Sequence, residues 1–378
     1  MEYPIYLDYN ATTPVDAEVV AEMWPFIESH YGNPSSSYST GRFNKEAIGK
    51  ARQQVAKAIN ASPDEIIFTS CATESNNLAI RGAAYANQEK GRHIISSNIE
   101  HPAVMGVCQH LEKNGFEVTY LPVDTNGMVN PNDVAKAIRP DTILISIMHA
   151  NNEVGTIQPI QQIASLARLH QIVFHTDSAQ SIGKIKVDVD ELGVDLLTIA
   201  GHKLYAPKGI GALYVRKGCH LENIMFGAGH EKGLRPGTEN VAYVVALGKA
   251  CELAHRDYEK NTKIMFATKT RILKGLNEKL GNRVTVHALN AQTLPNTLSV
   301  AFSGIDAFTL ASMLAKDVLI STGSACHADS VDISPVLKAM KMDAKTAVST
   351  VRISTGKYST FDEMDKAVEV IANLVSKF

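Results

Sequence analysis

The chain has 378 residues, of which 45% are hydrophobic and 20% charged, and its formal net charge is −2. That length is enough for two domains of roughly 100–200 residues each, and the composition is typical of a folded globular protein. Proteins that bind nucleic acid usually carry a strongly basic domain or stripe. The nearly neutral charge therefore gives no reason to expect a nucleic-acid partner.

The N-terminal sequence MEYPIYLDYNATTP has neither the basic start nor the apolar stretch of a secretory signal. No apolar run approaches the ~18 residues that a membrane-spanning helix needs. We therefore expect a cytoplasmic protein without a membrane partner. The five cysteines are odd in number and form no CxxC pair, so neither a disulfide framework nor a cysteine-rich zinc site is indicated, and no metal is expected.

Helical patterns at residues 17–30 and 44–59 come first, and short apolar runs then alternate with further helical patterns. Several runs are almost continuously apolar, as in strands that are covered on both faces. This alternation predicts an α/β fold with a mainly parallel, seven-stranded sheet and helices on both sides. The expected strands are Ile66–Thr69, His93–Ser97, Glu117–Leu121, Thr142–Met148, Ile172–Asp177, Leu196–Ala200 and Ala212–Val215, and the helices between them include Glu74–Asn87, Val104–Asn114 and Ile160–Leu169.

The pattern changes in the last third of the chain. A long helical stretch from about Asn240 to Leu280 precedes shorter elements, which predict a second, smaller α+β domain. Its expected strands lie near Thr297–Phe302, Leu319–Ser321 and Val351–Ile353, and its helices near Ala307–Ala315 and Phe361–Phe378. We assign residues 13–258 to the large domain, and residues 1–12 with 259–378 to the small domain that carries Cys326.

Lys203 and Asp177 each follow or end a predicted buried strand, and ligand sites in α/β sheets gather at the carboxyl ends of strands. A lysine held there with few carboxylate neighbours can have a lowered pKa and form a Schiff base, or it can simply point to water. Asp177 can pair with a protonated pyridine nitrogen, or it can cap a helix. Lysine and aspartate together are the usual protein contribution to pyridoxal-phosphate chemistry.

Three further loops have both functional and structural readings. In FTSCATESNN, Ala72 and Thr73 open a helix whose first amides would bind an anion, although Thr73 can equally be a cap. His101 lies before a proline at an expected helix start, where its ring can stack on a flat cofactor or serve only the structure. Asn152 lies in an unusually polar loop, NNEVGTIQP.

Cys326 lies in the small, Ser- and Gly-rich stretch STGSACHADS, whose composition is typical of an accessible loop. An exposed thiol is a liability unless its reactivity is used, so this residue is a candidate nucleophile. Arg352 ends a short predicted strand in VRISTG. Its guanidinium can clamp a substrate carboxylate in bidentate fashion, or form a surface ion pair.

Taken together and in this order, these segments resemble the NifS/IscS-like cysteine desulfurase family, in the class-V aminotransferase group of pyridoxal-phosphate enzymes. The resemblance runs from Tyr6 to Gly356 and includes motifs that are particular to this family. The matching segments are YLDYNATTPV, YGNPSS, FTSCATESNN, EHPAV, NNEVGTIQP, HTDSAQ, GHKLYAPKGIGALYV, GHEKGLRPGTENV, STGSAC and VRISTG. It implies the aspartate-aminotransferase fold, with a large domain that binds pyridoxal 5'-phosphate.

The resemblance also implies a role for each candidate. At the cofactor ring, Lys203 matches the Schiff-base lysine, Asp177 the partner of the pyridinium nitrogen, Gln180 the donor to the ring hydroxyl, and His101 the catalytic histidine that stacks on the ring. At the phosphate, the matching ligands are Ala72, Thr73 and His202, and Thr238 matches a ligand that reaches the neighbouring subunit's phosphate. For the substrate, Asn152 and Arg352 match the binders of the carboxylate, with Asn152 also beside the cofactor, and Cys326 matches the sulfur acceptor. The position of Thr238 implies a homodimer.

The activity implied is removal of sulfur from L-cysteine, which leaves L-alanine and a persulfide on Cys326 for transfer to an acceptor protein. Iron–sulfur cluster assembly, with a scaffold protein as acceptor, is one of several possible destinations for that sulfur. The alternatives are a selenocysteine lyase, another pyridoxal-phosphate enzyme of the same fold, or a non-catalytic sulfur-relay scaffold. An aminotransferase would need Lys203 and Asp177 but no reactive thiol.

The sequence departs from the family pattern at two positions. Ala200 stands where the family usually has a serine that donates to the phosphate, so one hydroxyl donor is lost. His327 follows Cys326 where small hydroxyl residues are common. A protonated histidine there would lower the pKa of the thiol, whereas one that points to solvent would not.

Overall fold

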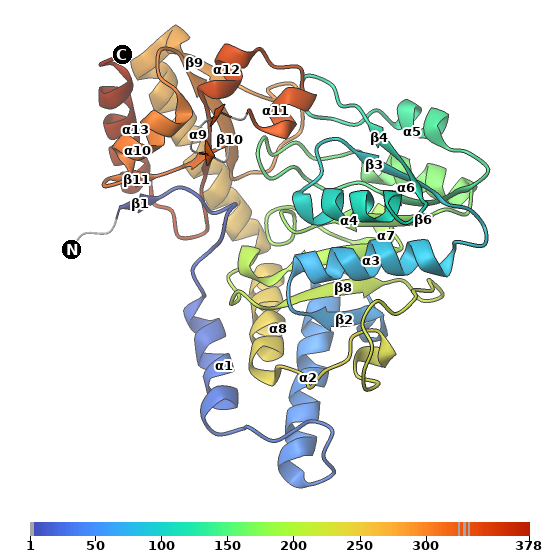
Figure 1. Ribbon diagram of the computed structural model, residues 1–378. Helices are drawn as coiled ribbons and strands as arrows, with labels where there is room; N and C mark the ends of the chain where they lie inside the picture. The colour runs from blue at the N-terminus through green and yellow to red at the C-terminus, as the bar shows by residue number, and fades with distance from the viewer. Residues whose placement is uncertain (1–3, 324–325, 328–329, 332) are drawn as a thin grey trace.

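The computed structural model describes residues 4–323 and 333–378, together with the backbone of residues 326–327 and 330–331. Its main feature is a seven-stranded sheet (Figure 1). The strand order is β2 (Ile66–Thr69), β8 (Gly211–Val215), β7 (Leu196–Ala200), β6 (Val173–Asp177), β5 (Thr142–Ser146), β3 (His93–Ser97) and β4 (Glu117–Leu121). All seven predicted strands are therefore confirmed, although β5 ends two residues before the predicted Met148.

Five neighbouring strands, from β7 to β4, run parallel, and β8 runs antiparallel to both β7 and β2. The reversal follows from chain length. Parallel neighbours need a crossover of a dozen or more residues, whereas only residues 201–210 connect β7 to β8. The short connection turns the chain back on itself and leaves Lys203 at the end of β7.

Alternate residues of the strands pack on opposite faces of the sheet, as expected for a layer covered on both sides. Helices α3 (Ala72–Ala86) and α4 (Pro102–Glu112) pack with Ile67, Ile94 and Leu213 on one face. Helices α2 (Ser39–Ala58), α6 (Ile160–Leu169) and α8 (Val241–Arg256) share the other core cluster, which includes Phe174 and Leu197. The predicted layered α/β architecture is confirmed.

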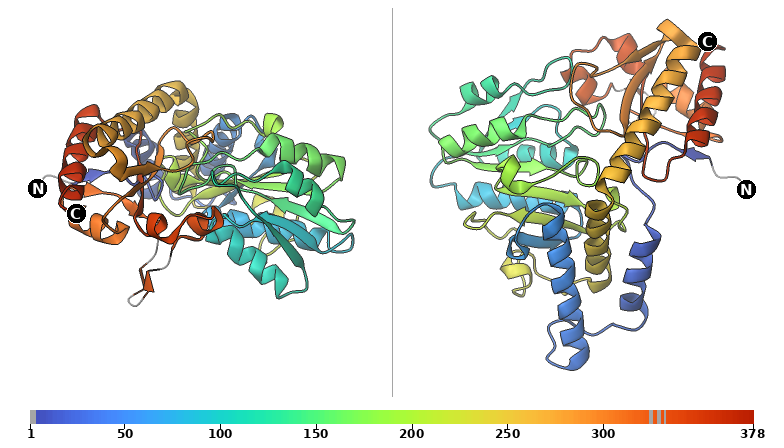
Figure 2. Two further views of the ribbon diagram at one scale, coloured as in Figure 1. Left: turned by 90° about the horizontal axis from the view of Figure 1, so that it is seen from above. Right: turned by 180° about the vertical axis from the view of Figure 1, so that it is seen from behind.

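Two N-terminal helices, α1 (Ala17–Glu28) and α2, extend away from the sheet at the lower end of the molecule (Figures 1 and 2). Asp16 is the N-cap of α1 and accepts a hydrogen bond from the Glu18 amide at 2.8 Å. Both helices pack against α8. Only their inner faces are therefore covered, which leaves large apolar side chains such as Trp24 and Phe43 exposed.

The smaller domain has an antiparallel sheet of order β12 (Ser321–Thr322), β15 (Thr350–Ser354), β10 (Thr297–Phe302) and β9 (Val284–Val286). A separate core joins Leu7 to side chains between residues 272 and 375. The N-terminal strand β1 (Ile5–Tyr6) adds to this domain by pairing with β11 (Val318–Leu319). The other helices here are α9 (Tyr258–Leu280), α10 (Ala307–Leu314), α11 (Pro335–Ala339), α12 (Ala344–Val348) and α13 (Phe361–Val375).

The helical stretch predicted near residues 240–280 forms two helices rather than one, because the chain turns at Asp257 between α8 and α9. The remaining elements are α5 (Pro131–Ala137), α7 (Val189–Leu192), and the hairpin of β13 (Cys326–His327) with β14 (Ser330–Val331). The domain limits at residues 12/13 and 258/259 stay a prediction. Among the described residues, no helix combines the length and apolar character that crossing a membrane requires.

Candidate active site

A cavity of about 390 Å³ opens at the carboxyl ends of the parallel strands, where the large domain meets Arg352 of the small domain. Its size suits a cofactor together with a small substrate. The predicted site residues that line it are Ala72, Thr73, His101, Asn152, Asp177, Gln180, His202, Lys203 and Arg352. Segments far apart in the sequence therefore meet in one place, whereas Thr238 does not line this cavity.

Lys203 ends a short 3-10 helix, Gly201–Lys203, that follows β7 directly. Its Nζ atom donates hydrogen bonds to the carbonyl oxygens of Asn10 and Ala11, the second at 2.8 Å. Burial, aided by the positive charge of Arg352, lowers the pKa of Lys203 to about 8. An amine with this pKa is partly neutral near pH 7 and can act as a nucleophile or a base.

Asp177 ends β6, and only 6% of the residue is exposed. Its carboxylate accepts hydrogen bonds from the Asn76 side-chain amide at 2.7 Å and from the Ala179 backbone amide at 2.9 Å. Both donors are neutral, so a protonated ring nitrogen would supply the positive partner that a buried carboxylate needs. A series of turns, rather than the helix considered from the sequence, follows Asp177.

The N-terminus of α3 faces the same cavity through Ala72 and Thr73. Cys71 is the N-cap and makes no side-chain capping hydrogen bond, so Thr73 is not the cap of this helix. The first amides of a helix have no acceptor within the helix and carry its positive dipole end. They therefore favour a phosphate, and Ala200 lies on the same cavity wall without the hydroxyl that the family pattern provides.

Two histidines face the cavity as neutral rings. Burial and the charge of Lys203 lower the pKa of His202 to about 4, and its Nδ1 atom lies 3.2 Å from the Thr12 hydroxyl. His101 is the N-cap of α4, and its Nδ1 atom accepts a hydrogen bond from the Ala103 amide at 3.1 Å. Burial lowers the pKa of His101 also. Because Nδ1 is an acceptor, the proton of the neutral His101 ring is on Nε2.

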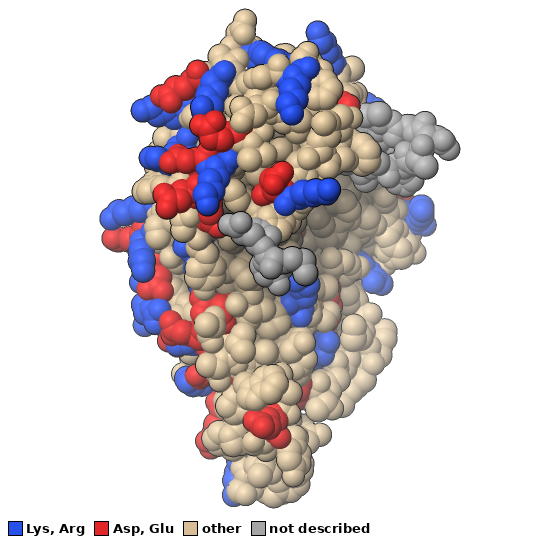
Figure 3. Space-filling model, turned by 90° about the vertical axis from the view of Figure 1, so that its left-hand side faces the viewer, with Lys and Arg blue, Asp and Glu red and all other residues tan. Residues whose placement is uncertain are grey.

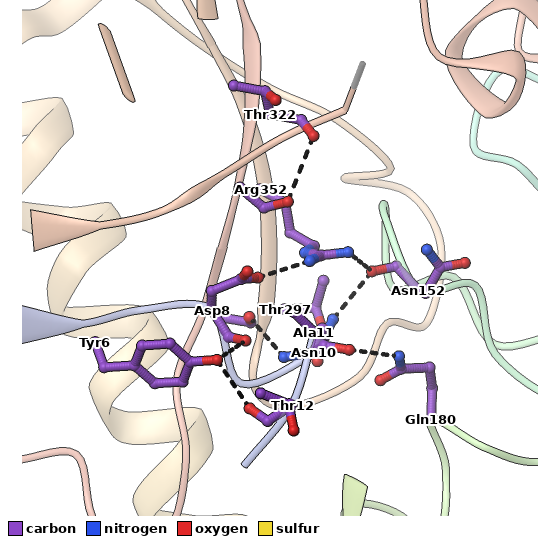
Figure 4. A network of polar contacts seen from close by, with 12 residues as sticks. Tyr6, Asp8, Asn10, Ala11, Thr12, Asn152, Gln180, Thr297, Thr322 and Arg352 are labelled. Carbon is purple, nitrogen blue, oxygen red and sulfur yellow. Dashed lines mark hydrogen bonds and ion pairs between the residues drawn. The ribbon is translucent and has the colours of Figure 1, made fainter. Parts of the chain in front are cut away.

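Arg352 lies in the central part of β15, and its guanidinium points from the small domain toward the cavity (Figure 4). Its Nη2 atom pairs with Asp8 Oδ1 at 2.6 Å, and its Nη1 atom donates to the Asn152 carbonyl at 3.0 Å. Two contacts from two segments fix the plane of the guanidinium. A fixed plane favours bidentate recognition of a carboxylate.

Asn10 joins these parts and was not a candidate from the sequence. The residue is 1% exposed, and its carbonyl oxygen accepts hydrogen bonds from Gln180 Nε2 at 3.0 Å and from Lys203. Its side-chain amide donates to the Asn152 carbonyl at 3.1 Å (Figure 4). Asn10 stands in the motif YLDYNATTPV, but nothing in that motif indicates contacts with residues about 140 to 190 positions away.

Asp8, Asn76 and Lys184 were also missed. Each contacts a predicted site residue: Asp8 accepts a hydrogen bond from Arg352, Asn76 donates to Asp177, and Lys184 donates to Gln180. Asn76 and Lys184 each lie four positions after a predicted site residue, Ala72 and Gln180 respectively, whereas Asp8 has no predicted site residue near it in the sequence. Such a signal is weak without knowledge of which side chains meet.

One predicted residue lies elsewhere, and the side chain of another lies outside the described residues. Thr238 is exposed in the segment before α8. The side chains of Cys326 and His327 lie outside the described residues, and their backbone forms strand β13. In the part of the chain that the structure describes, no group of three or more His, Cys, Asp or Glu side chains could hold a metal ion.

Comparisons with known proteins identify the family to which the chain belongs. The family model for class-V aminotransferases matches residues 5–367. Cysteine desulfurase IscS of Dictyoglomus turgidum is 45% identical over 378 residues, which is 100% of this chain and 96% of that protein. Among solved structures, a NifS-like protein has a TM-score of 0.93 at 37% identity, covering 99% of this chain and 100% of its own. The structure of SspA in complex with cysteine has a TM-score of 0.83 at 39% identity, covering 94% and 100%. The chain therefore belongs to the class-V aminotransferase family, among its cysteine desulfurases.

Proposed function

We propose that this protein is a pyridoxal-phosphate-dependent cysteine desulfurase, which removes sulfur from L-cysteine and leaves L-alanine with a persulfide on Cys326. One observation carries the proposal: a single cavity joins Lys203, with its lowered pKa, to the buried carboxylate of Asp177 and the oriented guanidinium of Arg352. The names of the relatives, and the cysteine bound by SspA, favour this function over the other activities considered.

The donor set of the cavity fits pyridoxal phosphate, which when bound supplies a ring that withdraws electrons from the substrate's Cα. Lys203 would hold it covalently, and Asp177 would keep its ring nitrogen protonated. The amides at the start of α3, with Thr73 and His202, would hold the phosphate. His101 would lie against the ring, and Gln180 would donate to its hydroxyl group.

Substrate binding and proton transfer are the tasks of this chain's own residues. Arg352 and Asn152 would bind the carboxylate of cysteine, which orients the Cα–H bond toward Lys203. The freed Lys203 amine would remove the Cα proton, since a pKa of about 8 makes it a competent base near neutral pH. His101 carries its proton on Nε2, the position from which it would exchange a proton with the substrate thiol.

Sulfur transfer is assigned to Cys326 as a thiolate. Its sulfur would attack the substrate sulfur, the carbon–sulfur bond would break, and its electron pair would stay with carbon. Protonation of that carbon and return of a proton from Lys203 to Cα would give alanine, and the new sulfur–sulfur bond is the persulfide. An acceptor protein would then remove the outer sulfur, and an iron–sulfur scaffold is the first acceptor to test. We place this reaction in the cytoplasm.

We also propose a homodimer in which Thr238 contributes to the neighbouring subunit's phosphate site. Thr238 is exposed and lies outside its own subunit's cavity. The projecting helices α1 and α2 and the loop between them expose large apolar side chains, including Trp24 at 54% and Tyr31 at 87%. Apolar surface of this kind marks protein interfaces. Figure 3 shows few charged side chains over this lower end and many over the small domain.

The test is a turnover assay on purified protein with cysteine, in which alanine and, with a reductant, sulfide are measured. We expect Cys326→Ala to keep the visible absorption of the bound cofactor and to lose sulfide release, and Lys203→Ala to lose both. Cys219→Ser is the matched control, because Cys219 is only half-buried and does not line the cavity. Sulfide release that survives in Cys326→Ala but not in Cys71→Ser would contradict the assigned acceptor.

A further inference from the structure

A second buried lysine, Lys184, lies next to the candidate active site. It is 5% exposed and belongs to the turns that follow β6. Its Nζ atom donates to Gln180 Oε1 at 2.7 Å and to Asn10 Oδ1 at 2.9 Å, and both acceptors are neutral amides. The charged groups that act most strongly on it are Lys203 and Arg352, both cations. Burying an amine in such surroundings lowers the free energy of unfolding, so the contacts that Lys184 makes there call for an explanation.

The contacts of Lys184 orient two amide side chains. An amine donates through N–H, so it selects the oxygen end of each amide and fixes which way the nitrogen end points. The Nε2 atom of Gln180 accordingly points away from Lys184 and donates to the Asn10 carbonyl at 3.0 Å (Figure 4). Asn10 is oriented in the same sense, since Asn296 also donates to its Oδ1 atom at 3.0 Å.

Gln180 lines the cavity, and Lys184 does not. Without the lysine, the amide would lose the contact that holds its oxygen end, and the hydrogen bond from Nε2 to the Asn10 carbonyl would be left to oppose an exchange of its two ends, which are nearly equal in size. An oxygen turned toward the cavity would then repel an acidic oxygen of a bound ring, where a nitrogen would donate a hydrogen bond to it. The direction of this one amide therefore decides whether the cavity presents a donor or an acceptor at that point.

We propose that Lys184 is a positioning residue that acts through Gln180, keeping its amide nitrogen directed at the hydroxyl oxygen of the bound cofactor. This inference rests on the proposed function, because the direction of Gln180 affects a cofactor only if the cavity holds one. A donor at that oxygen stabilises its deprotonated form, and so lowers the pH at which the lysine-bound cofactor loses its proton.

The experiment is a pH titration of the visible absorption band of the holoenzyme. We expect Lys184→Met and Gln180→Ala each to raise the midpoint by about one pH unit, the size expected for one hydrogen bond to a charged group. In the double variant the midpoint should move no further than in Gln180→Ala alone, because the lysine acts through that side chain. Lys184→Gln keeps an N–H donor and should shift the midpoint less.

Lys269→Met is the matched control. Lys269 is also a largely buried lysine, held by the Leu294 carbonyl at 2.9 Å, and burial lowers its pKa to about 8, but it does not line the cavity. Its variant should titrate like the wild type. If Lys184→Met does not fold, Lys184→Ala and Lys184→Gln are compared. The titration midpoint must then shift further from the wild-type value in Lys184→Ala than in Lys184→Gln.

A folded Lys184→Met protein with the wild-type midpoint would overturn the inference, as would shifts that add in the double variant or equal shifts for alanine and glutamine. Failure of the proposed function looks different. In that case the wild-type protein itself would show no visible band after incubation with pyridoxal phosphate, and no sulfide would form from cysteine.

Discussion

Burial sets the charge of individual side chains at the cavity. Lys203 and Asp177 face the same space, but their contacts differ, because Lys203 donates to two backbone carbonyls and Asp177 accepts from two neutral amides. Neither has an oppositely charged side chain as a hydrogen-bond partner among these contacts. Each can therefore change partner when a cofactor binds, without breaking a buried ion pair.

The lowered pKa of Lys203 predicts how the apoprotein takes up pyridoxal phosphate. Only the neutral amine can condense with the aldehyde, so the rate should rise about tenfold per pH unit below pH 8 and level off above it. The measurement is the rate at which the visible band appears at a series of pH values.

Arg352→Gln serves as the comparison for that titration, because Arg352 is the main charge that lowers the pKa of Lys203. The pH at which the uptake rate is half-maximal should be higher in this variant. A wild-type rate that still rises steeply up to pH 10 would show that burial does not depress this pKa.

Glu100 predicts a pH dependence of stability. Burial raises the pKa of this carboxyl group to about 8, whereas an unfolded glutamate titrates near ~4.3. Between these values the native state binds a proton that the unfolded state does not, so stability falls as pH rises, by at most about 1.4 kcal/mol per pH unit. Glu100→Gln removes this loss and keeps an oxygen that can accept from Ser97 and the Met148 amide.

Urea denaturation at several pH values measures this effect. The free energy of unfolding of Glu100→Gln should decline less between pH 5 and pH 8 than that of the wild type. Glu89→Gln is the control, since Glu89 is exposed and its removal should leave the wild-type slope. Equal slopes for all three proteins would contradict the prediction.

At the scale of elements, the site depends on how the start of α3 is held. Glu74 in its first turn accepts hydrogen bonds from the Ser70 amide at 2.8 Å and from Arg235 Nε at 2.9 Å. Gly211 at the start of β8 passes so close to this turn that an added Cβ would lie 2.8 Å from the Cys71 carbonyl carbon. The segment that carries Thr238 is therefore tied to the helix that faces the phosphate end of the cavity.

A second tie of that segment is Glu231, whose side chain is 3% exposed. It accepts two hydrogen bonds from the Arg52 guanidinium of α2, at 2.5 and 2.8 Å, and one from the Phe68 amide of β2 at 2.8 Å. Glu231→Ala would leave a largely buried guanidinium unpaired. We expect the free energy of unfolding to fall by about 3 kcal/mol, measured by urea denaturation.

The pair of Arg271 and Asp365 is the control for that change, because it is also bidentate but about half exposed on both sides. Asp365→Ala should cost less than about 1 kcal/mol, since exposed ion pairs contribute little. Equal losses in the two variants would show that burial does not decide the effect of removing Glu231.

At the scale of the whole molecule, the dimer proposal predicts complementation between damaged subunits. Lys203→Ala subunits lack the cofactor lysine, and Thr238→Val subunits should bind the cofactor more weakly. In a mixed dimer, one site has the intact Lys203 of one subunit and the intact Thr238 of the other. Each mixed dimer should therefore regain one tight cofactor site, which is about a quarter of all sites after random mixing of equal amounts, measured by visible absorption at limiting pyridoxal phosphate.

The control for complementation mixes Lys203→Ala with His202→Ala. Both residues line the cavity of the same subunit, so no mixed dimer contains an undamaged site. This mixture should not recover. Absence of recovery with Thr238→Val, or a monomeric protein by sedimentation, would contradict the proposed role of Thr238.

Much of the fold was predictable, because local patterns report local structure. Strands such as Ile66–Thr69 and Leu196–Ala200 are short apolar runs that the large domain buries on both faces. Their predicted first and last residues match those in the structure. The turn at Asp257 was not, since it interrupts a helical pattern without proline or glycine. The antiparallel direction of β8 depends on connection length rather than on its own residues.

The site residues also fall into those that the sequence indicates and those that it does not. Lys203, Asp177 and His101 stand in motifs that follow or end strands, so the sequence by itself determined the chemistry the protein offers. Asn10 and Lys184 carry no such signal, because Asn10 becomes a site residue by contact with Gln180, Lys203 and Asn152, and Lys184 by contact with Gln180 and Asn10. Only the tertiary structure decided those contacts, since burial and the direction of an amide arise when distant segments pack together.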